Sequence, residues 1–140
     1  MPVWRAVEAN FEKICDAVNR LPRTLAYTDF YFTNLAAARD GSRVLMFDYN
    51  YLCKSYVYSD IRNVCSGLGN EEARAAFLSA YGAFDRREIV VDGVASELAS
   101  LMIACRRETF PNWANDSISK MKDGRFAEAL KKLLENFDGE

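Results

Sequence analysis

The spacing of the apolar residues changes twice along the chain, and this change constrains the fold more than any other feature. Over the first 21 residues, apolar side chains recur every three or four positions, which predicts one amphipathic helix from Trp4 to Leu21 that ends before Pro22. The helical spacing is then lost, and three short apolar runs follow at Thr24–Tyr27, Asn34–Ala38 and Val44–Phe47. Asp40-Gly41 separates the last two runs and predicts a hairpin turn.

The helical spacing returns after Asp60. It predicts a helix over residues 73–84, a second over residues 94–105 in a region closed by Pro111, and a last helix from about Gly124 to Phe137. A chain of 140 residues has the usual size of one domain. We therefore expect a single α+β domain over residues 1–140, mainly helical, with a small β-hairpin region after the first helix.

The composition excludes several classes of function. The chain has no histidine, which excludes Ser-His and Cys-His nucleophiles and histidine-ligated zinc. Its four cysteines are scattered without a C-x-x-C pair, so we expect reduced thiols. The net charge of -2 predicts no nucleic-acid partner. With no long apolar segment and no signal-peptide pattern, we expect a cytoplasmic protein without a membrane partner.

Acids and aromatic residues gather between Tyr27 and Asp60, a segment that holds half of the aromatic residues. Asp29 and Asn34 lie between two predicted strands, and Asp48 directly follows the third apolar run. This order suits phosphoryl transfer, in which the first Asp orients or deprotonates an acceptor hydroxyl while the Asn and the second Asp hold a magnesium ion. The same residues also suit turns, in which case the chain is a small helical domain with no such site.

Residues 25–64 resemble the catalytic segment of the aminoglycoside phosphotransferase and choline/ethanolamine kinase family. That family has a His-x-Asp-x-x-x-x-Asn loop, a hairpin, an Ile-Asp-aromatic-Glu-Tyr segment and a downstream Asp-[Ile/Leu]-Gly-Asn. This sequence supplies Asp29 and Asn34, then Phe47-Asp48-Tyr49-Asn50-Tyr51, then Asp60-Ile61-Arg62-Asn63. Residues 70–82 are also similar to the helix that comes next in these kinases. Three pieces in the same order make the resemblance fairly specific.

The resemblance implies a fold, a reaction and a role for each residue. The fold is the carboxy-terminal lobe of a protein-kinase-like enzyme, with the catalytic loop in the hairpin region. The reaction is the ATP- and Mg-dependent phosphorylation of a hydroxyl on a small molecule of the choline, ethanolamine or aminoglycoside type. Asp29 is then the catalytic base, Asn34 and Asp48 are the magnesium ligands, and Asp60 is a buried acid that steadies the loop. Tyr27 stands where the family has histidine, so the usual support of the loop is changed.

The sequence also departs from the family. Asn50 replaces the common Glu, and Arg62 replaces the Gly. Only about 25 residues precede the loop, so the chain resembles the carboxy-terminal lobe without the lobe that binds the nucleotide. We expect a phosphotransferase that is incomplete on its own; the alternative is an inactive lobe that serves protein interaction or oligomerisation. An isolated lobe exposes an apolar face, so either function predicts a homodimer or a partner chain that covers it.

The aromatic residues near the predicted hairpin leave two uses open. Tyr49, Tyr51, Tyr56 and Tyr58 can contribute to a cage that holds a quaternary ammonium group by cation-π attraction. They can equally pack as core residues, which is the ordinary fate of aromatic side chains beside a hairpin.

Overall fold

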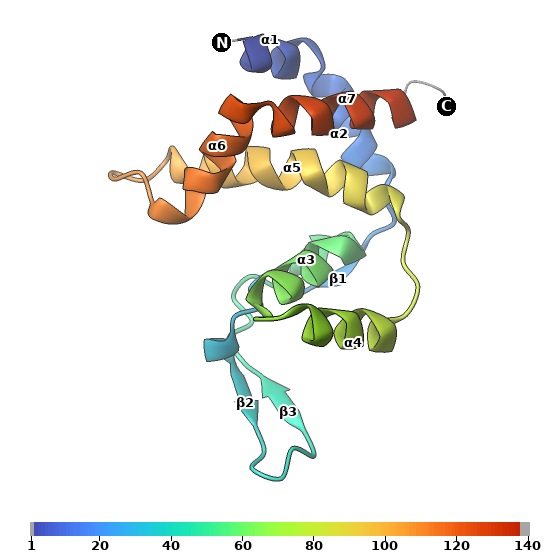
Figure 1. Ribbon diagram of the computed structural model, residues 1–140, viewed down its shortest axis with the longest axis vertical. Coiled ribbons are helices and arrows are strands. Elements are labelled where there is room, and N and C mark those ends of the chain that lie inside the picture. The colour runs from blue at the N-terminus through green and yellow to red at the C-terminus, as the bar shows by residue number, and fades with distance from the viewer. Residues whose placement is uncertain (1, 138–140) are drawn as a thin grey trace. The chain divides into compact units, whose positions relative to one another are not determined.

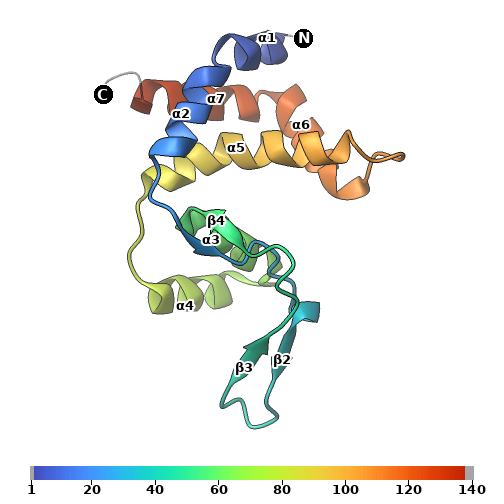
Figure 2. The same ribbon diagram turned by 180° about the vertical axis from the view of Figure 1, so that it is seen from behind.

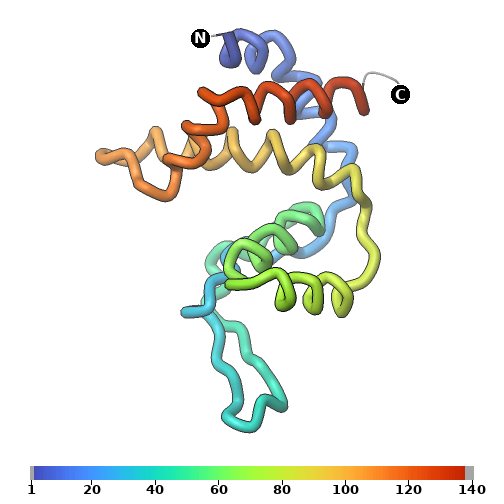
Figure 3. Tube along the Cα trace, viewed as in Figure 1, coloured from blue at the N-terminus to red at the C-terminus, as the bar shows by residue number. Residues whose placement is uncertain are grey.

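The computed structural model describes residues 2–137, which form two compact units. The first unit contains the chain up to Leu21 and from Arg86 onward, and the second contains Pro22–Asp85. The Cα trace in Figure 3 shows the chain leaving the first unit once and returning to it once. Helices dominate, and the strands form two small antiparallel sheets, which confirms the prediction of a mainly helical α+β chain.

The first unit consists of helices, drawn in blue and in yellow to red in Figure 1. Its elements are α1 (Pro2–Ala9), α2 (Phe11–Arg20), α5 (Arg87–Ala104), the short 3-10 helix η2 (Asn112–Ala114), α6 (Asn115–Asp123) and α7 (Arg125–Phe137). Helices α2, α5 and α7 pack against one another. Their shared core contains Ile14, Val91, Val94, Leu101, Phe126, Leu130 and Leu133, all of them buried.

The single helix predicted over Trp4–Leu21 is wrong, because the chain forms two helices that separate at Asn10. The Asn10 side-chain amide donates a hydrogen bond to the Ala6 carbonyl oxygen at 2.9 Å. A side chain that bonds the preceding turn in this way competes with continued helix formation. The predicted end is confirmed, since α2 stops at Arg20 and Leu21 is extended just before Pro22.

The carboxy-terminal half contains more helix than the apolar spacing predicts. Helix α5 begins at Arg87 and includes Ile89–Val91, a run without helical spacing of its own. Helix α6 was not predicted because most of its side chains are polar. The last predicted helix is confirmed as α7. Gly124, with φ of +91°, lets the chain turn sharply between α6 and α7.

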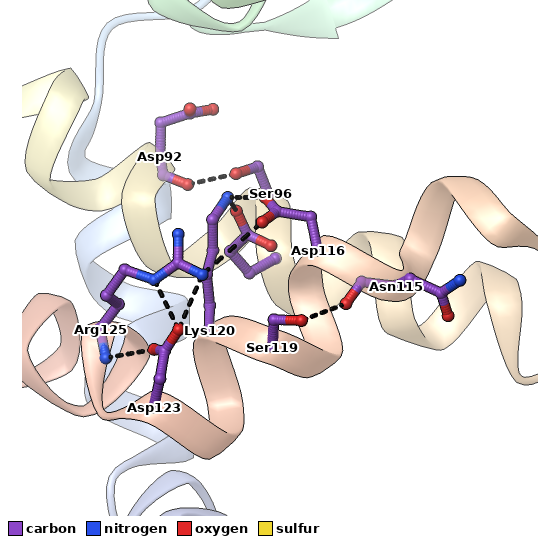
Figure 4. A network of polar contacts seen from close by, with 9 residues as sticks. Asp92, Ser96, Asn115, Asp116, Ser119, Lys120, Asp123 and Arg125 are labelled. Atoms are coloured by element: carbon purple, nitrogen blue, oxygen red, sulfur yellow. Dashed lines mark hydrogen bonds and ion pairs between the residues drawn. The ribbon is translucent and has the colours of Figure 1, made fainter.

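An ion-pair network fixes α6 against its neighbours in the first unit (Figure 4). Lys120 Nζ lies 2.6 Å from Glu97 Oε1 and 2.7 Å from Asp116 Oδ2. Arg125 bonds Asp123 at 2.7 Å and lies 3.7 Å from Asp116. Desolvation lowers the pKa of Lys120, but its bonds to Asp116 and Glu97 outweigh that effect and raise the pKa overall. The network is a structural support for the junction of α5, α6 and α7.

The second unit carries all the strands that the structure describes. Its elements are β1 (Thr24–Ala26), the 3-10 helix η1 (Phe32–Asn34), β2 (Leu35–Ala37), β3 (Val44–Met46), β4 (Cys53–Ser55), α3 (Val57–Gly67) and α4 (Glu71–Tyr81). Strand β1 pairs antiparallel with β4, and β2 pairs antiparallel with β3. Helix α3 packs on β1. The β2–β3 hairpin extends away from α3 and α4, as both ribbon views show (Figures 1 and 2).

The three predicted strands and the hairpin turn are confirmed. In the turn, the Gly41 N–H donates to the Ala38 carbonyl at 2.9 Å, and Gly41 has φ of +71°. Strand β4 and helix α3 were not predicted. The residues of β4, Cys-Lys-Ser, have no apolar alternation, and α3 begins at Val57, ahead of the position where the helical spacing was expected to return. None of the helices in residues 2–137 has the length and apolar character needed to cross a bilayer.

Candidate functional site

The loop between β1 and β2, residues 27–34, holds the first two predicted site residues together. The Asn34 side-chain nitrogen Nδ2 donates to the Asp29 carbonyl oxygen and to its carboxylate oxygen Oδ2, both at 3.2 Å. Tyr31 closes the loop between them, because its N–H donates to the Asp29 carbonyl and its carbonyl accepts from the Asn34 N–H, each at 2.9 Å. The five-residue gap is therefore the length that lets Asn34 reach back to Asp29.

Asp60 anchors the start of this loop from the first turn of α3. Its oxygen Oδ2 accepts a hydrogen bond from the Tyr27 N–H at 2.9 Å, and Oδ1 accepts one from the Thr28 N–H at 2.8 Å. Bonds to an ionised carboxylate are stronger than those between neutral groups. Asp60 is half-buried, whereas the resemblance implies a buried acid. It fixes the backbone directly before Asp29.

Thr28 has a strained backbone. Thr28 and Asp48, with φ of +58° and +65°, are the non-glycine residues with positive φ in the described part of the chain. Such a φ is a genuine outlier for a β-branched residue, and strained backbone of this kind concentrates at functional sites. Besides its bond to Asp60, Thr28 donates from Oγ1 to the Tyr51 carbonyl at 2.7 Å and accepts from Asn63 Nδ2 at 3.1 Å.

Sequence reasoning gave no role to Thr28 or Asn63. The available signal was the spacing of Asp60 and Asn63, which places both side chains on the same face of α3 one turn apart. That face holds the strained residue that precedes Asp29, and the acid bonds the Thr28 N–H while the amide bonds the Thr28 carbonyl.

The hairpin brings Asp48 to the same loop. The Phe47 N–H, in the residue before Asp48, donates to the Asn34 carbonyl oxygen at 3.1 Å. The Asp48 side chain is exposed, and its Oδ1 accepts from Asn50 Nδ2 at 2.5 Å. Asn34 thus contacts Asp29 through its side chain and the segment leading into Asp48 through its backbone.

Tyr27 links the loop to the end of β3. Its ring is only 6% exposed and lies edge-on to Phe30 and Tyr49, with centroid distances of 6.5 Å and 5.9 Å. Its hydroxyl donates to the Phe47 carbonyl oxygen at 2.5 Å. Tyr27, at the position where the resemblance predicts histidine, therefore makes a bond of its own to the residue before Asp48.

The environment of the phenol raises the pKa of Tyr27. Burial is the largest cause, and the negative charges of Asp29 and Asp48 act in the same direction. The Asn34 side chain lowers the pKa by hydrogen bonding and offsets part of this effect. The printed contacts join the same segments, because the Tyr27 hydroxyl bonds the Phe47 carbonyl before Asp48, while the Phe47 N–H bonds Asn34.

The raised pKa of Tyr27 predicts a specific loss of stability in alkali. The protonated phenol is favoured in the folded state, so its contribution is present below the usual pKa of 10.0 and is lost as the pH rises through the higher folded value. We expect the free energy of unfolding to fall more steeply above about pH 10 in the wild type than in Tyr27→Phe. Urea unfolding across this range measures the difference, and tyrosinate absorbance should lose a late-ionising group in the variant. Equal slopes would contradict a raised pKa for the Tyr27 phenol in the folded state.

The donor atoms fit a hard cation. Asn34 uses its amide nitrogen on Asp29, so its oxygen Oδ1 is the atom left for a ligand, and within residues 2–137 no hydrogen bond reaches this oxygen or Asp48 Oδ2. Oxygen donors of this kind suit magnesium. The described residues hold no group of three or more His, Cys, Asp or Glu placed to bind a metal. A magnesium ion on Asn34 and Asp48 would take its other ligands from water and from substrate phosphates.

No protein-family model, curated protein or solved structure matches this chain.

The four tyrosines considered for a cationic cage fall into two environments. Tyr56 is buried, and Tyr58 stacks on Phe84 with a centroid distance of 5.5 Å, so these two are packing residues at the start of α3. Tyr49 and Tyr51 are 57% and 64% exposed. Tyr49 donates from its hydroxyl to a backbone carbonyl of β3 at 2.6 Å, so it is oriented by the hairpin.

Proposed function

We propose that the second unit carries a phosphoryl-transfer site of the kinase carboxy-terminal-lobe type, built around Asp29, Asn34 and Asp48. The observation that carries the proposal is the position of Asn34. Its side chain bonds Asp29, and its carbonyl bonds the N–H that precedes Asp48. An acid, an amide and a second acid are thereby clustered in the order that phosphoryl transfer uses.

Each residue has a chemical role in this proposal. The Asp29 carboxylate orients the substrate hydroxyl and accepts its proton as the oxygen attacks the γ-phosphate. Asn34 Oδ1 and the Asp48 carboxylate would hold magnesium, which neutralises phosphate charge when bound. Asp60 holds the backbone before Asp29, and Tyr27 holds the backbone before Asp48. Neither of these two touches the reacting atoms.

The proposed co-substrate is ATP, and the proposed acceptor is a small molecule with a hydroxyl, of the choline, ethanolamine or aminoglycoside type. The three central residues supply an acid and cation ligands, but no positive side chain for the nucleotide phosphates. Phosphoryl transfer requires such a group or a phosphate-binding loop. We therefore propose that the groups that bind the ATP phosphates directly lie on another polypeptide segment, and that this chain alone binds Mg-ATP more weakly, through the cation on Asn34 and Asp48.

The test is nucleotide binding that depends on Asp48. We expect calorimetry to show binding of Mg-ATP by the wild type and at least about tenfold weaker binding by Asp48→Asn, because the variant loses the charge that holds the cation. ADP release is then assayed against choline, ethanolamine and aminoglycosides. Asp40→Asn is the matched control, since Asp40 is an exposed acid bonded to Ser42 in the hairpin turn. A wild type that neither binds Mg-ATP nor releases ADP with any acceptor overturns the proposal.

A second function is favoured by a different observation. Val44, Leu45 and Met46 of β3 are exposed, as expected for a surface that another protein covers. On this proposal the second unit is an inactive lobe that serves as a protein-interaction or oligomerisation module. Tyr27 and Asn50, which replace the family's histidine and glutamate, agree with lost catalysis. Failure of the Mg-ATP test would leave this function standing.

A further inference from the structure

Two consecutive side chains bind the backbone on both sides of Asp48. The Tyr27 hydroxyl donates to the Phe47 carbonyl oxygen, in the residue before Asp48, at 2.5 Å. The Thr28 hydroxyl oxygen Oγ1 donates to the Tyr51 carbonyl oxygen, three residues after Asp48, at 2.7 Å. The turn from Asp48 to Tyr51 is therefore fixed at both ends, and Thr28 fixes its far end.

The conformation of this turn sets the direction of the Asp48 carboxylate. Asp48 has φ of +65°, and its Oδ1 accepts a hydrogen bond from Asn50 Nδ2 at 2.5 Å. The Leu52 N–H donates to the Tyr49 carbonyl oxygen at 3.1 Å, which closes the turn. A residue at positive φ that is not glycine keeps this conformation because its surroundings hold it. The bonds at the two ends of the turn therefore orient the carboxylate that the proposed reaction uses as a cation ligand.

The backbone groups and the hydroxyl of Thr28 all have hydrogen-bond partners. The Thr28 N–H donates to Asp60 Oδ1 at 2.8 Å, and the Thr28 carbonyl accepts from Asn63 Nδ2 at 3.1 Å, so both backbone groups are bound by α3. The hydroxyl is the group of Thr28 that reaches the turn after Asp48. Since α3 fixes the Thr28 backbone, the hydroxyl bond transmits that fixed position to Tyr51.

The backbone conformation of Thr28 does not by itself account for a threonine at this position. Thr28 has φ of +58°, which a β-branched residue adopts only with strain. Glycine adopts this φ without strain, and asparagine adopts it with less strain than threonine. A strained residue of this kind persists because its surroundings hold it. The Oγ1 bond to Tyr51 is the part of that support which a glycine would lack.

We propose that Thr28 is a positioning residue of the candidate site, whose hydroxyl holds Asp48 in place as a cation ligand. Thr28 directly precedes Asp29, so the same residue also joins the proposed proton acceptor to the turn that carries Asp48. The two carboxylates must act on one bound phosphate, which requires a fixed separation between them. The inference rests on the proposed phosphoryl transfer and deepens it, since Thr28 acts through the backbone of Asp48 and not on the reacting atoms.

Calorimetry with Mg-ATP tests the hydroxyl. Thr28→Val keeps the size and branching of the side chain but loses the hydroxyl, whereas Thr28→Ser keeps the hydroxyl. We expect the dissociation constant for Mg-ATP to rise about fivefold in Thr28→Val, the worth of one ordinary hydrogen bond, and to stay near the wild-type value in Thr28→Ser. Thr24→Val is the matched control, because Thr24 is an exposed threonine of β1 and undergoes the same change. If binding is too weak for calorimetry, the KM for Mg-ATP in ADP release is compared instead.

Thr28→Gly separates positioning from stability. It lacks the hydroxyl but adopts the positive φ without strain, so it should need more urea to unfold than Thr28→Val. Its affinity for Mg-ATP should nevertheless fall as in Thr28→Val. Circular dichroism shows which variants are folded, and Thr28→Gly decides alone if Thr28→Val does not fold.

The outcomes separate this inference from the proposed function. Wild-type affinity for Mg-ATP in Thr28→Gly, or in a folded Thr28→Val, overturns the role of Thr28, as does an equal loss in Thr28→Ser. These results leave the proposed phosphoryl transfer standing. A wild type that neither binds Mg-ATP nor releases ADP overturns both.

Discussion

Asp60→Ala is expected to lower the stability of the second unit by about 3 kcal/mol, which is a large share of the stability of a small domain. The variant removes both oxygens that accept the Tyr27 and Thr28 N–H groups. Thr28 would then keep its positive φ with only its bonds to Tyr51 and Asn63. We expect the backbone to relax out of this conformation and the 27–34 loop to lose its order.

Amide hydrogen exchange measures this effect locally. Protection of the Tyr27 and Thr28 amides should fall sharply in Asp60→Ala, while amides of α7 in the first unit should keep theirs. Asp40→Ala is the matched control, because Asp40 also accepts two hydrogen bonds, both from Ser42 within an exposed turn. Urea unfolding gives the free-energy change for each variant. If Asp60→Ala cost no more than Asp40→Ala, the carboxylate of Asp60 would not be an anchor of the loop.

The sequence predicts those parts of the fold whose apolar residues have one clear period. The last helix is an example, because its stripe includes Phe126, Leu130 and Leu133, all buried. The hairpin is another, because Asp40-Gly41 separates two apolar runs and Gly41 takes the positive φ that the turn needs. In both cases the local sequence and the packing require the same conformation, so local reasoning is sufficient.

The missed elements depend on contacts between residues distant in the sequence. Strand β4 exists because Cys53–Ser55 pairs with β1, and nothing in its own three residues favours a strand. The break at Asn10 depends on one side-chain bond to Ala6, which an unbroken apolar stripe conceals. The start of α5 is hidden for another reason, since Ile89–Val91 lies in a helix with both apolar and acidic buried residues and has no clear stripe. Apolar periodicity detects a helix that buries a single apolar face. It fails where an element depends on a distant partner or where acidic residues are buried as well.

The candidate site was also predictable only in part: its residues could be selected from the sequence, but their supporting contacts could not. Asp29, Asn34 and Asp48 could be selected because acids and amides in loops and after strands are poorly explained by packing. The resemblance implied that Asp60 steadies the loop, but the backbone groups that it binds could not be derived, because they lie more than 30 positions away along the chain, as in the Asp60 to Thr28 bond. Tyr27 was recognised only as a departure from a pattern. Its bond to the Phe47 carbonyl forms only in the folded hairpin, so it could not be derived from the sequence.

Tyr27 and Asp60 divide the support of the site between them. Asp60 fixes the backbone on the approach to Asp29, and the Tyr27 hydroxyl fixes the backbone on the approach to Asp48. Asn34 connects these two backbone segments, because its side chain bonds Asp29 and its carbonyl accepts from the Phe47 N–H. Asp29 and Asp48 are both held through their preceding residues, and within residues 2–137 their oxygens Asp29 Oδ1 and Asp48 Oδ2 carry no hydrogen bond, so these are the atoms that the proposed reaction would use. A pair of turn residues would need no such support from a distant helix and a buried phenol.

Asp29→Asn is expected to separate catalysis from binding in the proposed reaction. The amide has nearly the same shape as the carboxylate but cannot accept the proton of the substrate hydroxyl. We expect turnover, measured as acceptor-dependent ADP release, to fall about a hundred- to ten-thousand-fold, the range for loss of a general base. The affinity for Mg-ATP should change little, because Asn34 and Asp48 carry the proposed cation ligands. Asp48→Asn should instead have weakened Mg-ATP binding as its primary defect.

The contrast between these two variants decides what Asp29 does. If it only closes the loop with Asn34 and Tyr31, Asp29→Asn leaves turnover almost unchanged, because the loop bonds from its backbone carbonyl survive the substitution. Tyr27→Phe provides the intermediate case, since it keeps both carboxylates and loses the bond to the Phe47 carbonyl. A base has to be aligned with the bound phosphate to within a fraction of an ångström. Loss of turnover in Asp29→Asn with full Mg-ATP affinity, and a smaller loss in Tyr27→Phe, would identify a proton acceptor held in place by the hairpin.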